Sequence, residues 1–484
     1  KATMLRRPDS ESRFVSWRVG GLAALVSLGL SACSLAPTYK VPDVPAADLY
    51  ANATSPWTEA KPADHLDRDA WWKLYGDSRL DDLQTKLIAN NASLAAALAH
   101  YEQSEAFTRQ VRSALFPTLG LNGNGQRDRE SDTRPLRGTT SPAVYSSYTI
   151  GVQADYEVDL WGRVRDTVAA GTAEQAAAAG DLASVRLSLQ AQLADSYLQL
   201  NGLDRQVKVL NDSIVAFSRA LELTQSRHEG GISSGLDVAR AQTQLSNAKS
   251  QLTQTQAQRA LIQHAIAVLV GDSASTFNLA TNDAQVKVPT IPLDVPSVIL
   301  QRRPDVAAAE RRTAEANARV GVARSAYFPQ LTLDAQGGWQ SSAWGSIATA
   351  PNRFWSIGPT LLLSVFDGGR RKAVVDAAKA ATDEAGAKYR DVVLNAFAQV
   401  EDNLVLLRDL GTALTDQRAA ADAAQRSVDL SLDRYRNGAV GYLDVVQAQT
   451  AALDAQRSVI DLETRQLRAS VQLIRALGGG WSQA

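Results

Sequence analysis

The sequence predicts an α+β membrane protein whose chain contains two copies of one unit of helices and strands. Three observations support this prediction. Segments of the two halves match in the same order, one stretch alternates polar and apolar residues over twelve positions, and two very long stretches carry apolar residues at heptad spacing. We expect the strands to contribute to a β-barrel and the long helices to continue it as an α-helical coiled-coil barrel.

The N-terminus is typical of a lipoprotein signal peptide over residues 1–32. Arginines precede an apolar stretch at 19–30, which is too short to span a bilayer, and small residues lead up to the single cysteine, Cys33. We therefore expect Cys33 to become the lipidated first residue of the mature chain. The next residue is Ser34 and not an aspartate, which favours sorting to the outer membrane. The alternative is a buried thiol beside an ordinary cleavage site.

The rest of the chain divides into two repeats with flanking segments. The matches include RSALFPTL (112–119) with RSAYFPQL (324–331), and LDV at 236–238 with LDV at 443–445. We assign residues 33–92 to a lipidated N-terminal segment with a first helix, 93–271 to repeat 1, 272–304 to a linker or equatorial segment, 305–478 to repeat 2 and 479–484 to a C-terminal tail. Units of this length are far longer than solenoid repeats.

Each repeat reads as a helix, two strands, a long helix, a short turn and a returning helix. A helix is expected at 93–114, where Pro117 prevents its continuation, and residues 149–160 alternate with period two as a strand does. The other expected elements are a strand from 119, a polar loop near 127–143, a helix at 305–326, and strands at 331–336 and 354–366.

The long helices are expected at 164–228 and 371–435, and at about 1.5 Å per residue each would be roughly 100 Å long. Returning helices are expected at 236–270 and 443–477. The heptad positions are Leu200, Leu203, Val207, Leu210, Ile214, Phe217 and Leu221 in one long helix and Val393, Phe397, Val400, Leu404, Leu407, Gly411 and Leu414 in the other. The short helices could stack end to end on the returning helices and complete a helical cylinder.

The four expected strands cannot close a barrel within one chain, because the smallest membrane-spanning barrels have eight strands and lipid cannot satisfy an open edge. Three copies would supply twelve strands. Polar strand positions would then line the lumen, with Asp155, Glu157, Asp159 and Asp334 as candidates. Two alternatives stay open at this point: a soluble β-sandwich, and polar positions that are merely solvated.

Composition argues against several classes of function. The chain has 50 Lys+Arg against 51 Asp+Glu, so it lacks the basic excess of a nucleic-acid-binding protein. No window holds the roughly 18 apolar residues of a membrane-spanning helix, which excludes a helical inner-membrane transporter. The four histidines and one cysteine show no metal-ligand spacing, and enzyme motifs are lacking. We expect no catalytic residue, no metal and no cofactor beyond the lipid.

Several segments are similar to the outer-membrane factors of tripartite efflux, the TolC-like family, and most of all to its NodT/OprM lipoprotein branch. The segments that resemble it are CSLAPTYKVPDVP (33–45), WWKLYGDSRLDDL (71–83), DLWGR (159–163), ILQRRPDVAAAERR (299–312), ARSAYFPQL (323–331) and VFDGGRR (365–371). The resemblance implies a homotrimeric barrel with a long periplasmic helical extension. It also implies an adaptor (membrane fusion protein) and an inner-membrane pump, often of the RND class, as partners, with outer-membrane lipid around the barrel.

The resemblance further implies a function for the two tips, where the long helices turn back. Gly231 and Gly438 match tip glycines that meet the adaptor, Asp237 and Tyr435 match a pair that can bond across neighbouring coils, and Asp444 matches a constriction aspartate. Some relatives carry a second aspartate where Gln447 stands here. Without the resemblance, Asp237 and Asp444 read as residues of helix first turns, and both glycines read as turn residues.

Three functional hypotheses follow. The first is a passive exit duct of an efflux pump for drugs or toxic compounds, gated at its periplasmic tips. The second is an outer-membrane channel for type I protein secretion, and the third is a periplasmic coiled-coil lipoprotein scaffold without a pore. The sequence does not specify the transported substrate, the particular adaptor or the opening trigger.

Overall fold

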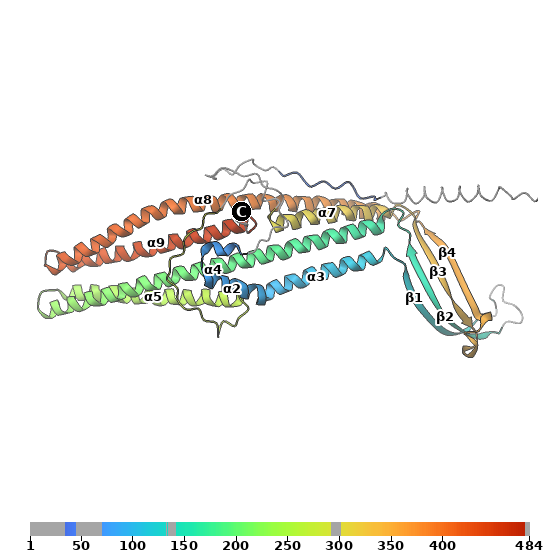
Figure 1. The fold of residues 1–484 in the computed structure, drawn as a ribbon, viewed down its shortest axis with the longest axis horizontal. Coiled ribbons are helices and arrows are strands. Elements are labelled where there is room, and N and C mark those ends of the chain that lie inside the picture. Colours follow the sequence, from blue (N-terminus) through green and yellow to red (C-terminus); the bar gives the residue numbers. More distant parts are fainter. Residues whose placement is uncertain (1–33, 45–69, 132, 134–141, 292–301, 480–484) are drawn as a thin grey trace, which may run out of the picture. The chain divides into compact units, whose positions relative to one another are not determined.

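A computed structural model describes residues 34–44, 70–131, 133, 142–291 and 302–479. The chain divides into two compact units, which are described separately (Figure 1). The first unit contains residues 102–177 and 310–388 with the N-terminal segment, and the second contains residues 43–101, 178–309 and 389–484. The signal peptide assigned to 1–32 and the lipidated Cys33 lie outside the described residues.

The same order of elements occurs in both halves. The first half has α3 (Ala92–Ser113), β1 (Thr118–Arg129), β2 (Val144–Glu157), α4 (Arg163–Glu229) and α5 (Gly235–Leu269), and the second has α7 (Pro304–Ser325), β3 (Gln330–Ser341), β4 (Arg353–Leu362), α8 (Arg370–Arg436) and α9 (Tyr442–Ala476). Short elements are η1 (Trp71–Tyr75), α2 (Ser78–Asn90), η2 (Trp344–Ser346) and η3 (Ala350–Asn352). Both long helices have 67 residues and both returning helices have 35, so corresponding helices agree in length.

The expected helices agree with the structure to within a residue or two, but the strand boundaries do not. The strand expected at 149–160 begins at Val144 and ends at Glu157. It ends early because the Asp159 carboxylate accepts hydrogen bonds from the backbone N–H groups of Val164 and Arg165 and so caps α4. β1 continues to Arg129, within the expected polar loop, because it stays paired with β2 to Val144.

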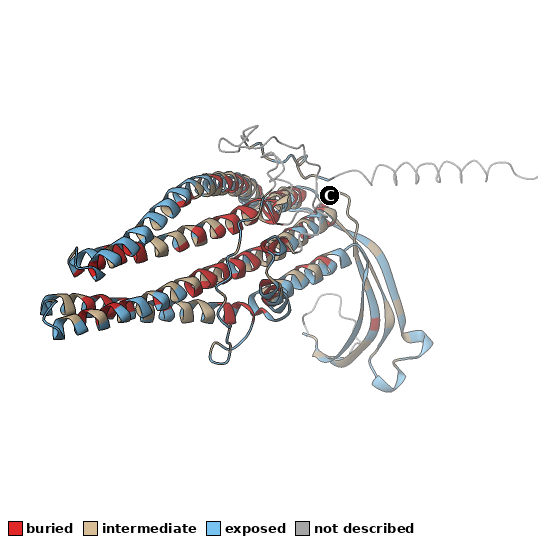
Figure 2. Cartoon of the chain, turned by 60° about the vertical axis from the view of Figure 1, so that its left-hand side comes forward, coloured by how far each residue is buried: buried red, intermediate tan, exposed pale blue. Residues whose placement is uncertain are grey.

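The first unit contains one antiparallel sheet in the order β1-β2-β3-β4. One face of this sheet carries apolar residues that are solvent-exposed in the single chain. Figure 2 shows the strands coloured mostly exposed or intermediate. The exposed apolar residues of this face are Leu119, Leu121, Ile150, Val152, Leu333, Trp339, Trp355, Ile357 and Leu361. A β-sandwich would cover such a face with a second sheet, and the described strands form only this one. The face is therefore suited to a nonaqueous environment, and the alternation in the sequence correctly predicted its position.

The second unit is built from two helical hairpins. Hairpin 1 consists of α4 with α5, and hairpin 2 consists of α8 with α9. Predicted heptad residues such as Leu210, Val393 and Val400 are fully buried, which confirms the seam. No helix in the described ranges combines the length and the apolarity needed to cross a membrane.

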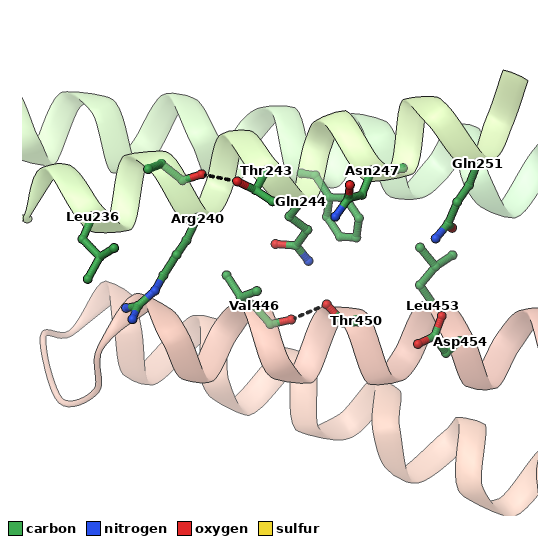
Figure 3. A pocket seen from close by; sticks show the side chains of 13 residues that line it. Leu236, Arg240, Thr243, Gln244, Asn247, Gln251, Val446, Thr450, Leu453 and Asp454 are labelled. Atoms are coloured by element: carbon green, nitrogen blue, oxygen red, sulfur yellow. Dashed lines mark hydrogen bonds between the residues drawn. The ribbon is translucent and has the colours of Figure 1, made fainter.

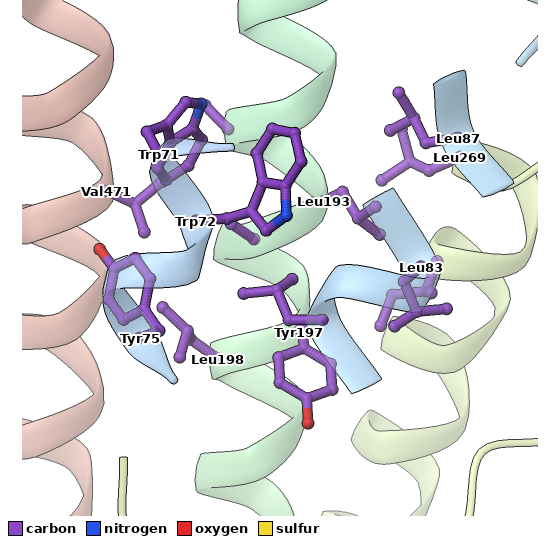
Figure 4. Close-up of a cluster of buried hydrophobic side chains, with 14 of the residues drawn as sticks. Trp71, Trp72, Tyr75, Leu83, Leu87, Leu193, Tyr197, Leu198, Leu269 and Val471 are labelled. Carbon is purple, nitrogen blue, oxygen red and sulfur yellow. The ribbon is translucent and has the colours of Figure 1, made fainter. Parts of the chain in front are cut away.

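A cluster of aromatic residues from η1 fills the space between the hairpins (Figure 4). Trp71, Trp72 and Tyr75 are buried against α4 and α9. The Tyr75 hydroxyl lies 2.7 Å from Ser470 Oγ of α9. The segment that precedes the first repeat is thus part of the hydrophobic core.

Arg303 joins the start of α7 to hairpin 2. Its guanidinium donates to the Asp305 carboxylate (Nη2–Oδ2 2.6 Å), to Gln399 Oε1 (3.0 Å) and to the carbonyl of Ala476 (3.1 Å). Burial alone would raise the pKa of Asp305, but the hydrogen bond and charge of Arg303 outweigh it and hold that pKa below its ordinary value. Arg303 therefore has a structural function at the start of α7.

The Arg303–Asp305 pair predicts a pH dependence of stability. Because the folded-state pKa of Asp305 is depressed, its contribution is complete above the unfolded value of about 4 and is lost as the pH falls through the lower folded value. The melting temperature of Asp305→Asn should be below wild type at neutral pH, and the gap should narrow below about pH 4. Asp422→Asn, at an exposed position of α8, serves as the control. A difference in melting temperature that stays constant from about pH 6 down to about pH 3 would contradict the assignment.

Gly202 of α4 allows hairpin 1 to approach hairpin 2. A Cβ atom at Gly202 would lie 2.2 Å from Thr464 Oγ1 of α9, whereas one at Gly411 of α8 would meet only the mobile end of Gln466 at 3.1 Å. We expect Gly202→Ala to reduce hydrogen-exchange protection of neighbouring amides, with overpacking costing about 1–3 kcal/mol. Gly411→Ala should gain up to about 1 kcal/mol from helix propensity. Thr464→Ala should recover part of the Gly202→Ala loss, and equal effects of the two alanines would refute the close contact.

Candidate functional site at the hairpin tips

Both long helices end in the same backbone turn. Gly231 and Gly438 have φ angles of 75° and 73°, in the left-handed region that favours glycine. The backbone bonds of the two turns correspond: Gly231 to His228, Ile232 to Arg227, Gly438 to Tyr435 and Ala439 to Arg434. This is the Schellman pattern, so the turn interpretation of both glycines is confirmed. Their predicted contact with an adaptor remains a prediction.

Tyr435, at the end of α8, connects the two tips. Its ring is buried and packs edge-on against Tyr442, with 5.3 Å between ring centroids. The Arg227 guanidinium at the end of α4 lies 4.7 Å from the Tyr435 ring centroid, and its Nη1 donates to the Tyr435 carbonyl at 2.8 Å. The hydroxyl groups of Tyr435 and Ser233 are 3.3 Å apart. One tyrosine therefore fixes hairpin 1 to hairpin 2 within the same chain.

Asp237 is engaged in its own helix start. The Ser234 hydroxyl accepts from the Asp237 backbone N–H (3.2 Å) and donates to the Asp237 carboxylate (2.9 Å). Arg240 lies 3.4 Å from the same carboxylate. These contacts form a capping arrangement at the start of α5, as the helix-start interpretation expects. The Tyr435 hydroxyl lies beside Ser233 in this chain, and the predicted bond between Asp237 and Tyr435 across neighbouring coils remains a prediction.

Asp444 occupies the matching position of α9 but has different surroundings. The residue that precedes α9 is Gly441, which has no side chain to accept from the helix N-terminus. The Asp444 side chain is exposed, and its carboxylate has no hydrogen bond or ion pair within the described part of the chain. Asp444 thus presents an uncompensated negative charge at the tip of hairpin 2. Asp237 at the tip of hairpin 1 does not, because Ser234 and Arg240 contact its carboxylate.

Further links between the hairpins lie away from the tips. The Glu463 carboxylate of α9 forms an ion pair with Arg205 of α4, in hairpin 1, at 2.6 Å. It forms a second ion pair with Arg418 of α8, within hairpin 2, at 2.5 Å. Arg468 of α9 pairs with Asp195 of α4 at 2.9 Å. Glu463 is largely buried, so removal of one arginine would cost more here than at a surface ion pair. Separation of the hairpins therefore requires the loss of two ion pairs, Arg205–Glu463 and Arg468–Asp195, as well as the Tyr435 contact.

The four carboxylates predicted to line a lumen have separate positions. Asp155 and Asp334 are directly opposite each other on β2 and β3, so their side chains share the polar face of the sheet. Thr360 donates to Asp334 at 2.7 Å. Glu157 pairs with Arg163, and Asp159 lies beyond the strand in the cap of α4. The lumen-lining role stays a prediction for all four.

The sequence analysis missed Arg227, Ser233 and Tyr442. Arg227 and Arg434 occupy equivalent positions in the two tip turns, which was the available signal. That signal could not show that Arg227 reaches Tyr435, because the two residues are far apart in the sequence. Burial raises the pKa of the Tyr442 phenol to about 12, so this residue is uncharged at neutral pH.

The chain matches the family model "Outer membrane efflux protein" at residues 83–272 and 295–479. Among curated relatives, outer membrane protein OprJ of Pseudomonas aeruginosa is 31% identical and the match covers 96% of each chain. Pyoverdine export outer membrane protein OpmQ of the same organism is 33% identical over 87% of this chain and 89% of the relative. Toluene efflux pump outer membrane protein TtgC of Pseudomonas putida is 31% identical over 95% of both.

Solved structures agree with these relatives. The outer-membrane channel OprN has a TM-score of 0.85 and 29% identity, covering 93% of this chain and 100% of that structure. The open state of the MtrE outer membrane channel of Neisseria gonorrhoeae has a TM-score of 0.81 and 27% identity, covering 93% and 98%. The likeness therefore extends over both repeats.

The tip geometry predicts different effects for two substitutions of Tyr435. Tyr435→Phe keeps the ring between Arg227 and Tyr442 and loses only the 3.3 Å contact with Ser233, so it should cost under about 1 kcal/mol of local stability. Tyr435→Ala removes the ring and should cost about 3–5 kcal/mol. Hydrogen exchange of the amides at 432–446 measures both. Equal losses for Phe and Ala would show that the hydroxyl, and not the ring, holds the tips.

Proposed function

The chain belongs to the outer membrane efflux protein family, and we propose that three copies of it form the exit channel of a tripartite efflux pump. The protein is an outer-membrane efflux protein with a helical extension, like the channels to which it is similar. The observation that carries the proposal is the family match over both halves of the chain. We propose that the channel conducts solutes passively and catalyses no reaction.

The sheet supports the trimeric part of this proposal. β1 and β4 each have one unpaired edge in the sheet of a single chain, and the apolar face of that sheet is exposed. Unpaired backbone groups are not tolerated in lipid, so β1 of one copy must pair with β4 of the next. Three copies would supply the twelve strands of a closed barrel.

The partners follow from the same assignment. We propose that a periplasmic adaptor contacts the tips at Gly231 and Gly438, and that an inner-membrane pump of the RND class supplies the energy. Two of the relatives are named for pyoverdine export and toluene efflux, which supports small organic molecules as the cargo.

A lipid anchor at Cys33 is also proposed. The adjoining segment is held in place within the first unit: the Ser34 hydroxyl donates to Asp166 at 2.6 Å, and Asn317 and Arg324 donate to the carbonyls of Pro37 and Leu35. An anchor at Cys33 would therefore be attached to a segment that is fixed to the first unit. Intact mass of the mature protein should show acyl chains on Cys33, and Cys33→Ser should abolish them. An unmodified cysteine in the purified membrane protein would disprove the anchor.

We propose that Asp444 forms a ring of negative charge at the closed periplasmic end. Three copies would place three uncompensated carboxylates near the axis, which favours cations and opposes tight closure. The Tyr435 contact and the ionic links between the hairpins would hold the tips together until the adaptor loosens them.

Single-channel conductance of the purified trimer in planar bilayers tests this function. We expect a small cation-selective conductance in wild type, and in Asp444→Ala a conductance of changed size with weaker cation preference. Asp433→Ala is the control, because it removes a carboxylate near the same tip that pairs with Arg436. A conducting but unaltered Asp444→Ala channel would restrict Asp444 to a structural role. A trimer of correct native mass that conducts nothing, even with Tyr435→Ala, would refute the channel.

A further inference from the structure

A cavity of about 360 Å³ lies between α5 and α9, the two returning helices (Figure 3). Its size falls within the range of small-molecule sites, and its walls are mainly apolar. Leu236 of α5, Val446 and Leu453 of α9 and Phe217 of α4 supply the apolar lining. The cavity is thus lined by residues of both hairpins, a short distance from their tips.

Most polar side chains of this cavity are already used. The hydroxyls of Thr243 and Thr450 donate to carbonyls of their own helices. Arg240 pairs with Asp237, and Gln251 Oε1 accepts from Arg457 of α9. Asn247 and Asp454 lie at exposed positions, where water can satisfy them.

Gln244 is the exception. Its side chain is 8% exposed and points between the two helices (Figure 3). Neither Oε1 nor Nε2 has a hydrogen-bond partner in the described part of the chain. A buried carboxamide without partners is costly, and an apolar side chain of similar size would avoid that cost. The amide is therefore placed to meet a group from outside the chain.

We propose that this cavity binds a small apolar molecule that carries a cis amide, as a lactam ring does. Because the N–H and carbonyl of a lactam lie on the same side, the ligand N–H would donate to Gln244 Oε1 and the ligand carbonyl would accept from Gln244 Nε2, which uses both functions of the carboxamide. The apolar remainder would pack against Leu236, Val446 and Leu453. A charged ligand fits less well, because the apolar walls would desolvate it without a free counter-charge.

The bound molecule would bridge α5 and α9 and so hold the two hairpins at a fixed spacing. This site goes beyond the proposed export function, because its ligand would be held by the protein and not exported. Binding can be measured without conductance, so failure of one proposal is distinguishable from failure of the other.

Two probes that differ in one group test the proposal. The lactam 4-phenylpiperidin-2-one carries the cis amide, and 3-phenylcyclohexanone has the same outline with a CH₂ group in place of N–H. Saturation-transfer NMR titrations of the purified full-length protein should show the amide binding roughly tenfold more tightly than the ketone, the worth of about one hydrogen bond. Equal affinities would overturn the proposal and leave Gln244 to be satisfied by water.

Substitutions at two buried glutamines test whether Gln244 causes the difference in affinity between the two probes. Gln244→Leu removes both hydrogen bonds to the lactam and the one to the ketone, so it should reduce the lactam affinity roughly a hundredfold and the ketone affinity roughly tenfold, which removes the difference between the probes. Gln449→Leu is the matched control, because Gln449 is equally buried on α9 but does not line this cavity. An amide affinity that survives Gln244→Leu would also overturn the proposal. If Gln244→Leu does not fold, the comparison of the two probes on wild type still decides.

Discussion

The hydrogen-bonding requirement of strand edges is the constraint on which the rest of this molecule depends. A four-stranded sheet with an exposed apolar face cannot satisfy β1 and β4 within one chain. The requirement makes self-association a condition of stability in lipid. In the proposed trimer each chain would supply the same four strands, so the helices that follow would be repeated around the same axis. The polar contacts between hairpins would then be the part of that assembly that can change without breaking the barrel.

The two hairpins are held by contacts of different chemistry at different distances from the tips. Aromatic packing near η1 is apolar and fully buried, whereas Glu463 with its two arginines is ionic and Tyr435 combines a ring face with a hydrogen bond. Apolar burial changes little with ionic strength, but exposed charges are screened by salt. The aromatic cluster near η1 thus holds the hairpins together without charged groups, whereas the contact at the tip includes the charged Arg227.

The sequence was sufficient for features that depend on local pattern. Heptad spacing located the buried seam at Leu210 and Val400, and the two tip glycines were correctly placed in turns because only glycine adopts their φ angle cheaply. Strand ends were not predictable, since β2 stops where Asp159 caps a helix and β1 continues for as long as its neighbour pairs with it. The contact of Arg227 with Tyr435 joins residues from different repeats, and no local pattern records such a pairing.

Duplication of one unit has left two tips with the same backbone and different electrostatics. Ser234 stands before α5 and binds the carboxylate of Asp237, and Gly441 stands at the matching position before α9 and leaves Asp444 without such a partner. The state of each acidic group is thus set by a residue three positions earlier in the chain. A serine at position 441 could donate a hydrogen bond to the Asp444 carboxylate, as Ser234 does to that of Asp237, and so partly satisfy its charge without removing the carboxylate. The charge pattern of the assembled tips can therefore be retuned by neutral side chains, and an inventory of charged residues alone would overlook such variants.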